Sequence, residues 1–185
     1  MRTLEELKVK NFKSICEQTL QLGRLNVFIG GNGSGKSNLI GVFHFLNRAA
    51  AGDLQNYTGE GGSESYFNAS VLSDGTLRFI CLATLLLQPA LPTVILLDEP
   101  ELGRHPAAIS LLAALLESTA QRTQILVATQ SVTLINQFTP EFVWVVEREN
   151  RASVFKHLES ADMSAWLENY SLGELWEKNI LGGRP

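Results

Sequence analysis

A glycine-rich segment near the start of the chain, Gly30–Ser37, constrains the fold more than any other part of the sequence. It reads Gly-Gly-Asn-Gly-Ser-Gly-Lys-Ser and matches the pattern G-x-x-x-x-G-K-[ST] at every required position. The apolar run Leu25–Ile29 before it is typical of a buried strand, and apolar residues at helical spacing follow over residues 38–47. A strand, a glycine loop and a helix in this order surround a phosphate with backbone N–H groups. The segment therefore predicts a nucleoside triphosphate site.

Each residue type in this loop has an expected task. The glycines let the backbone approach a phosphate closely, Lys36 would reach the β- and γ-phosphates, and the Ser37 hydroxyl would ligate Mg²⁺. A chance glycine-rich turn followed by Lys-Ser is the alternative, and the flanking strand and helix argue against it. The residues expected to bind the nucleotide are Gly30, Asn32, Gly33, Ser34, Gly35, Lys36, Ser37 and Asn38.

The bulk composition is that of an ordinary soluble globular domain. Hydrophobic residues make up 45% and charged residues 18% of 185 residues, which suits one domain over 1–185 with its own core. The net charge of −4 gives no overall basic character for nucleic acid, although a local basic patch stays open. No signal-peptide core or membrane-length apolar run is present, so a cytoplasmic protein is expected. Cys16 and Cys81 lie among apolar residues and are expected to be buried free thiols.

Segments with strand and helix patterns alternate along the rest of the chain. Residues 7–22 predict an antiparallel hairpin, and Leu77–Gln88 is apolar nearly all round, which predicts a helix buried on most sides. Thr93–Leu97 is a continuous apolar run, as expected of a central parallel strand. Together the segments predict an α/β fold with a mostly parallel central sheet flanked by helices, plus the N-terminal hairpin.

Polar residues follow three of the predicted strands. The three segments that follow the strands are the glycine loop, Asp98-Glu99 and Thr129-Gln130-Ser131. Because ligands bind outside the carboxyl ends of parallel strands, the three segments are expected to converge on one edge of the sheet. Asp98 would hold Mg²⁺ together with Ser37, and Glu99 would orient or deprotonate an attacking water. The alternative is that two acidic residues merely end a strand at the surface.

The combined motifs resemble the ATP-binding-cassette type of ATPase head. The resemblance rests on Gly30–Ser37, Leu72–Thr76 and Ile95–Pro100, and Lys10–Ser14 and Asp98–Gly103 make the chain similar to the RecF/SMC/OLD-like branch. It implies a P-loop NTPase that binds and hydrolyses ATP with Mg²⁺, dimerises around ATP, and serves DNA maintenance or phage defence in a prokaryote.

In that family the Leu-Ser-x-Gly-x signature loop acts on the ATP of a second subunit. By this resemblance Ser73 and Gly75 would contact the γ-phosphate held by the partner of a homodimer. A helix N-cap followed by a turn is the alternative for this segment. The residues with implied catalytic roles are Glu99, Lys36 and Gln130.

Two departures from the family pattern leave a second function open. Gln130 stands where the family usually has His, and it can donate a hydrogen bond but cannot take up a proton or carry a charge. The glycine-rich stretch 48–65 reads as a linker in place of a longer insertion, the part that usually meets DNA or a partner protein. An ATP-gated dimerisation module with negligible turnover is therefore the alternative to an ATPase. A small-molecule kinase is a third reading, but it has no need of the signature loop.

The C-terminal part of the chain is rich in aromatic residues. Trp166, Tyr170 and Trp176 lie at helix-like intervals. Their spacing predicts packing in the core, and stacking against nucleic-acid bases is the alternative.

Overall fold

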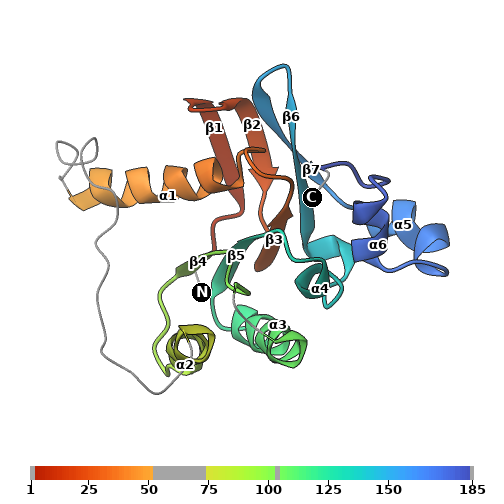
Figure 1. The fold of residues 1–185 in the computed structure, drawn as a ribbon. Helices are drawn as coiled ribbons and strands as arrows, with labels where there is room; N and C mark the ends of the chain where they lie inside the picture. Colours follow the sequence, from red (N-terminus) through yellow and green to blue (C-terminus); the bar gives the residue numbers. More distant parts are fainter. Residues whose placement is uncertain (1–2, 52–73, 103–104, 184–185) are drawn as a thin grey trace.

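The computed structural model describes residues 3–51, 74–102 and 105–183 of the chain (Figure 1). They form a central five-stranded sheet, a separate two-stranded sheet at the N-terminus, and helices on both faces of the central sheet. The predicted α/β fold class is confirmed.

The central sheet has the strand order β4-β5-β3-β6-β7. The first four strands run parallel, and β7 is antiparallel to its neighbour β6. The strands are β3 (Leu25–Ile29), β4 (Val94–Asp98), β5 (Gln124–Thr129), β6 (Val143–Glu149) and β7 (Ala152–His157). All five residues of β3 are buried, since this strand lies in the middle of the sheet between two apolar layers. The glycine loop therefore leaves the sheet at its centre.

The position of β4 corrects one expectation. Among the described residues β4 pairs only with β5 and forms the edge of the sheet, so the prediction of a central strand was wrong. Ile95 belongs to the cluster of apolar side chains on one face of the sheet, and Leu96 packs against the cluster on the other. An apolar run indicates that both faces of a strand are covered. It does not indicate whether the strand is central, because that depends on which other strands pair with its backbone.

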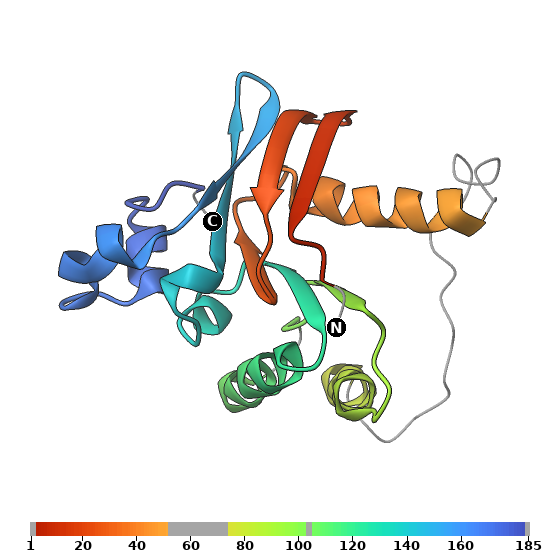
Figure 2. The ribbon, with the colours of Figure 1, turned by 180° about the vertical axis from the view of Figure 1, so that it is seen from behind.

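The two faces of the sheet are covered by different elements (Figure 2). The hairpin of β1 (Glu6–Phe12) and β2 (Ile15–Gln21), together with α1 (Lys36–Ala51), covers one face. Helices α2 (Asp74–Leu87) and α3 (Pro106–Ala120) lie below the other face. The antiparallel hairpin is confirmed, with Leu7 opposite Leu20. Of the linker predicted over 48–65, residues 48–51 are the last turn of α1, and the others lie outside the described residues.

Helix α2 is less buried than its composition suggests. Leu82 and Leu86 are buried and face α3, but Ile80 is 48% and Leu87 64% exposed. The expectation of a helix buried on most sides was wrong because α2 presents only one face to the body of the domain. Both cysteines are also exposed rather than buried, Cys81 on α2 and Cys16 on β2.

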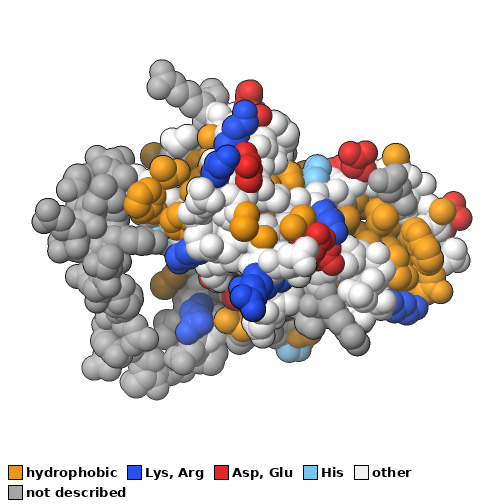
Figure 3. All heavy atoms as spheres, turned by 90° about the horizontal axis from the view of Figure 1, so that it is seen from above, with side chains coloured by type: hydrophobic (Ala, Val, Ile, Leu, Met, Phe, Trp, Pro, Cys, Tyr) orange, Lys and Arg blue, Asp and Glu red, His pale blue; other side chains and the backbone are white. Residues whose placement is uncertain are grey.

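The C-terminal segment folds back onto the sheet through short helices. These are α4 (Val132–Ile135), a 3₁₀ turn at Pro140–Phe142, α5 (Ser160–Leu167) and α6 (Leu172–Glu177). Trp176 is fully buried, and its indole N–H donates to the carbonyl oxygen of Gly183 at 2.6 Å. Trp166 and Tyr170 are 44% and 37% exposed, so core packing was the wrong prediction for these two. They lie on a separate helix and its following turn, and apolar side chains gather on the surface at this end (Figure 3).

On the face seen in Figure 3, basic and acidic side chains are interspersed. No helix in the described ranges has both the length and the apolar character needed to cross a membrane.

Candidate active site

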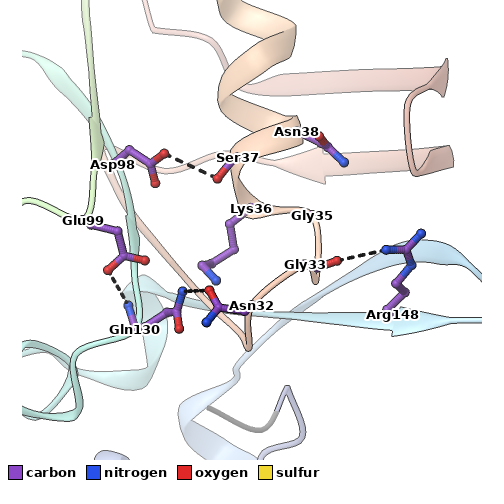
Figure 4. Close-up of a pocket in the computed structure, with 10 residues that line it drawn as sticks. All are labelled: Asn32, Gly33, Gly35, Lys36, Ser37, Asn38, Asp98, Glu99, Gln130 and Arg148. Carbon is purple, nitrogen blue, oxygen red and sulfur yellow. Dashed lines mark hydrogen bonds between the residues drawn. The ribbon is translucent and has the colours of Figure 1, made fainter.

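A polar cavity of about 360 Å³ opens at the carboxyl ends of the parallel strands (Figure 4). Its walls come from the loops that follow β3, β4 and β5, with one side chain from β6. The three segments that the sequence placed at one edge of the sheet therefore meet. The lining residues are Asn32, Gly33, Gly35, Lys36, Ser37, Asn38, Asp98, Glu99, Gln130 and Arg148.

The glycine loop is shaped by close backbone contacts. Gly35 has a φ of +117°, and a Cβ atom there would lie 1.9 Å from the Ser153 hydroxyl. A Cβ atom on Gly30 would lie 2.2 Å from the carbonyl oxygen of Val146. These two positions require glycine because β6 and β7 pass directly behind the loop. After Gly35 the chain enters α1, and its first residues, Lys36, Ser37 and Asn38, line the cavity.

Lys36 is held inside the loop. Its Nζ donates to the carbonyl oxygens of Gly30 at 2.5 Å and Gly31 at 3.2 Å, and the side chain is buried. Burial lowers the pKa of Lys36, while the charges of Glu99, Asp98 and Glu101 raise it in part. The ammonium group therefore lies between the loop backbone and the acidic residues after β4, where the phosphates of a nucleotide would add negative charge.

Ser37 and Asp98 offer two oxygen ligands side by side. The Ser37 hydroxyl donates to Asp98 Oδ2 at 3.4 Å, and both side chains face the cavity (Figure 4). Burial, followed by the charge of Glu99, raises the pKa of Asp98, and the bond from Ser37 lowers it. A hydroxyl beside a carboxylate is a hard donor pair and fits Mg²⁺, which takes its remaining ligands from water and phosphate.

Glu99 and Gln130 face the glycine loop from the neighbouring strand ends. The backbone N–H of Gln130 donates to Glu99 Oε2 at 3.2 Å, and Gln130 Nε2 donates to Asn32 Oδ1 at 2.7 Å. Glu99 has a φ of +47°, a left-handed conformation uncommon outside glycine. Its own N–H donates to the carbonyl oxygen of Ala128 at 2.8 Å, so the end of β5 holds Glu99 in place.

Comparisons with known proteins bear on the family and the fold of the chain. The family model described as "AAA domain, putative AbiEii toxin, Type IV TA system" matches residues 55–136, less than half of the chain. A search of curated proteins found no significant match.

The solved structures cover more of the chain. The SMC head domain from Thermotoga maritima aligns over 85% of this chain and 100% of its own, with a TM-score of 0.63 and 15% identity. Two proteins of ABC transporters align over 96% of this chain at TM-scores of 0.52. One is cbiO1 from Clostridium perfringens, part of the transporter complex cbiONQ, at 17% identity and 93% of its length. The other is an ATP-binding cassette of an ABC transporter in its ADP conformation, at 15% identity and 96% of its length.

The chain has the fold of an ABC/SMC-like P-loop ATPase head. At this level of identity the likeness concerns the fold, and the roles of individual residues rest on the geometry of the cavity.

The segment that resembles a signature loop, Leu72–Thr76, is only partly described. Ser73 lies outside the described residues. Gly75 lies in the first turn of α2 and does not line the cavity beside the glycine loop of the same chain. The assignment of both residues to a partner's nucleotide stays a prediction.

Two further residues predicted to bind the nucleotide have hydrogen-bond partners elsewhere in the fold. Asn38 lines the cavity, but its Nδ2 donates to the Ser14 hydroxyl at 2.6 Å. The Ser34 hydroxyl is buried and has no hydrogen-bond partner among the described residues, whereas the Ser34 carbonyl oxygen accepts a bond from Ser153. Ser34 does not line the cavity, whereas Asn38 does, and both residues help to hold the glycine loop.

Sequence reasoning missed Arg148. Its guanidinium donates to the carbonyl oxygen of Gly33 at 3.3 Å and lines the mouth of the cavity. The only signal in the sequence is a basic residue near the end of a predicted strand. Arg148 reaches the glycine loop because β6 lies next to β3, a pairing between segments far apart in the chain.

Proposed function

We propose that this head binds ATP with Mg²⁺ and hydrolyses it. The observation that carries the proposal is that one cavity is lined by Lys36, by the Ser37–Asp98 pair and by Glu99 beside Gln130. A phosphate-binding loop, a pair of metal ligands and a carboxylate for water are the parts that phosphoryl transfer to water needs.

The residues of the cavity divide the work. The backbone N–H groups of the loop and of the first turn of α1 bind the phosphates, and Lys36 neutralises the charge that develops on them. Mg²⁺, when bound at Ser37 and Asp98, supplies further charge neutralisation on the phosphate oxygens. Glu99 orients the attacking water and accepts its proton. Gln130 donates a hydrogen bond toward the γ-phosphate from its place above Asn32.

We further propose that two copies close around ATP. The support is the resemblance of Leu72–Thr76 to a signature loop, with Gly75 at the start of α2 and away from its own cavity. In a two-fold arrangement Ser73 and Gly75 of each copy would complete the site of the other. A cytoplasmic role in DNA maintenance or phage defence is the setting that this family resemblance implies. DNA or a partner protein would then respond to closure of the heads.

An ATP-gated dimerisation module with negligible turnover is the second candidate. The observation that favours it is that Gln130, which stands where the family usually has a titratable His, donates its side-chain N–H to Asn32. In this candidate ATP binding alone would drive closure of the dimer.

The test is ATP turnover per molecule, measured against protein concentration for the wild type and Glu99→Gln. For a two-headed ATPase, specific activity rises with concentration, and Glu99→Gln binds ATP, loses turnover and accumulates as a dimer. Glu117→Gln, a change in α3 away from the cavity, is the control and should behave as wild type. ATP binding without turnover at any concentration would contradict hydrolysis and leave the dimerisation module. Absence of ATP binding would contradict both.

A further inference from the structure

Glu101 carries a buried carboxyl group that has no role in the proposed binding or hydrolysis of ATP. It lies in the turn between β4 and α3, is 7% exposed, and does not line the cavity. The Thr129 hydroxyl donates to Glu101 Oε1, and Oε2 has no hydrogen-bond partner among the described residues. Burial, together with the nearby Glu99 carboxyl, raises the pKa of Glu101 to about 7, and the bond from Thr129 lowers it in part. A buried carboxyl with one oxygen unpaired is costly and calls for an explanation.

The Glu101 bond joins two segments of the active site. Thr129 is the last residue of β5, and its Oγ1 also accepts a bond from the Ser131 N–H at 3.0 Å. Gln130 lies between these two residues and donates its N–H to Glu99. The side chains of Glu99 and Glu101 therefore both bond the turn after β4 to the end of β5 and the loop that follows it. The bond from the Glu99 N–H to Ala128 is a third link between these segments.

This tie matters because the backbone at Glu99 is strained. Its φ of +47° is disfavoured for a residue with a Cβ atom, and such a conformation persists only where the surroundings hold it. On one side Glu99 N–H is bonded to Ala128, and Leu102 N–H closes a turn onto the Glu99 carbonyl oxygen at 3.2 Å. Glu101 lies inside that turn, and its bond to Thr129 anchors the turn to the sheet.

We propose that Glu101 is a positioning residue for hydrolysis, which holds the Glu99 carboxylate against the Gln130 loop through its bond to Thr129. The inference rests on the proposed role of Glu99 in hydrolysis. The glycine loop and α1, which bind the phosphates, are not part of the turn after β4 or the loop after β5. Loss of the Glu101–Thr129 bond therefore leaves ATP binding intact and impairs turnover.

The test uses two pairs of matched variants. Glu101→Leu and Thr129→Val remove the bond and keep the volume of the side chain, whereas Glu101→Gln and Thr129→Ser keep an acceptor and a donor. A displaced Glu99 should lower kcat roughly tenfold or more in the first pair. In the same pair the Kd for ATP should stay within about twofold of wild type. Glu101→Gln and Thr129→Ser should retain kcat.

A double variant separates the bond from two independent effects. Glu101→Leu combined with Thr129→Val should be no slower than the slower single variant, because both remove one interaction. Wild-type kcat in Glu101→Leu and Thr129→Val would overturn the proposal, as would equal losses in kcat and ATP affinity. Equal impairment of Glu101→Gln and Glu101→Leu would also overturn it, since the negative charge beside Lys36, and not the bond, would then be what matters.

If the wild type does not turn over ATP, the proposed hydrolysis fails, but the role of Glu101 in holding the turn can still be tested by hydrogen exchange. Amides over 99–102 and 129–131 should exchange faster in Glu101→Leu and Thr129→Val than in Glu101→Gln. Amides of α1 should be unchanged in all variants. Equal protection of 99–102 in all variants would show that Glu101 holds nothing in place and would overturn the inference.

Discussion

The Ser153 hydroxyl donates a hydrogen bond to the carbonyl oxygen of Ser34 at 2.5 Å, although 119 positions separate the two residues in sequence. Ser153 is almost fully buried in β7, and its Oγ lies 2.6 Å from the Ser14 hydroxyl at the turn of the N-terminal hairpin. The Ser14 hydroxyl in turn accepts a bond from Asn38. Two hairpins from opposite ends of the chain thus hold the back of the glycine loop.

Replacing Ser153 by alanine tests this support. Ser153→Ala leaves the buried Ser34 carbonyl oxygen without its partner, which should lower the free energy of unfolding by about 1–3 kcal/mol. ATP affinity should fall with it, because the loop loses the contact that fixes its shape. Chemical denaturation and ATP titration measure the two effects. The control is Ser164→Ala, which removes an exposed hydroxyl from α5; equal behaviour of the two variants would contradict the prediction.

Replacing Arg148 by alanine tests the cation at the mouth of the cavity. Arg148 is exposed, so Arg148→Ala should leave the unfolding free energy nearly unchanged. The Kd for ATP should rise roughly tenfold, because a charge-assisted contact to phosphate is lost. Arg151→Ala, in the adjoining turn and away from the cavity lining, should bind ATP like the wild type. An unchanged Kd in Arg148→Ala would exclude Arg148 from nucleotide binding.

The buried Glu101 carboxyl makes stability depend on pH. Its pKa is about 7 in the folded protein against 4.5 for the free group, so the folded state holds the proton more tightly. The resulting stabilisation is fully present below pH 4.5 and is lost as the pH rises toward 7; above that it is absent. The shift corresponds to about 3 kcal/mol at most.

Urea denaturation of wild type and Glu101→Gln between pH 4 and 8 measures this effect. The unfolding free energy of Glu101→Gln relative to wild type should increase between pH 4.5 and 7 and then level off. A difference that is constant across the range would show that Glu101 titrates normally.

Both cysteines should react while the protein is folded. Cys16 and Cys81 are exposed, so a thiol reagent should label each at a rate close to that of the unfolded chain. Cys16→Ser and Cys81→Ser assign the two signals. Protection of either thiol until urea unfolds the chain would favour the burial expected from sequence.

Much of the local structure was predictable because it depends on neighbouring residues. The apolar run of β3, the glycine loop and the start of α1 follow from Gly30–Ser37 and its flanks. The N-terminal hairpin predicted over residues 7–22 is likewise present as β1 and β2. The meeting of Lys36, Asp98, Glu99 and Gln130 was also predictable, since parallel strands bring their carboxyl ends to one edge.

Other features were decided by the tertiary structure alone. The edge position of β4, the exposure of Trp166 and the reach of Arg148 into the cavity depend on which segments become neighbours. Periodicity shows which face of an element is apolar, but it does not show what covers that face.

The sequence by itself therefore determined an α/β chain with a phosphate loop and an acidic strand end, because these features depend on the spacing of neighbouring residues and on the chemistry of single side chains. Only the tertiary structure decided how the site is held. The contacts Ser153–Ser34 and Glu101–Thr129 join residues distant in the chain, and such contacts exist only once the strand order has brought their backbones together.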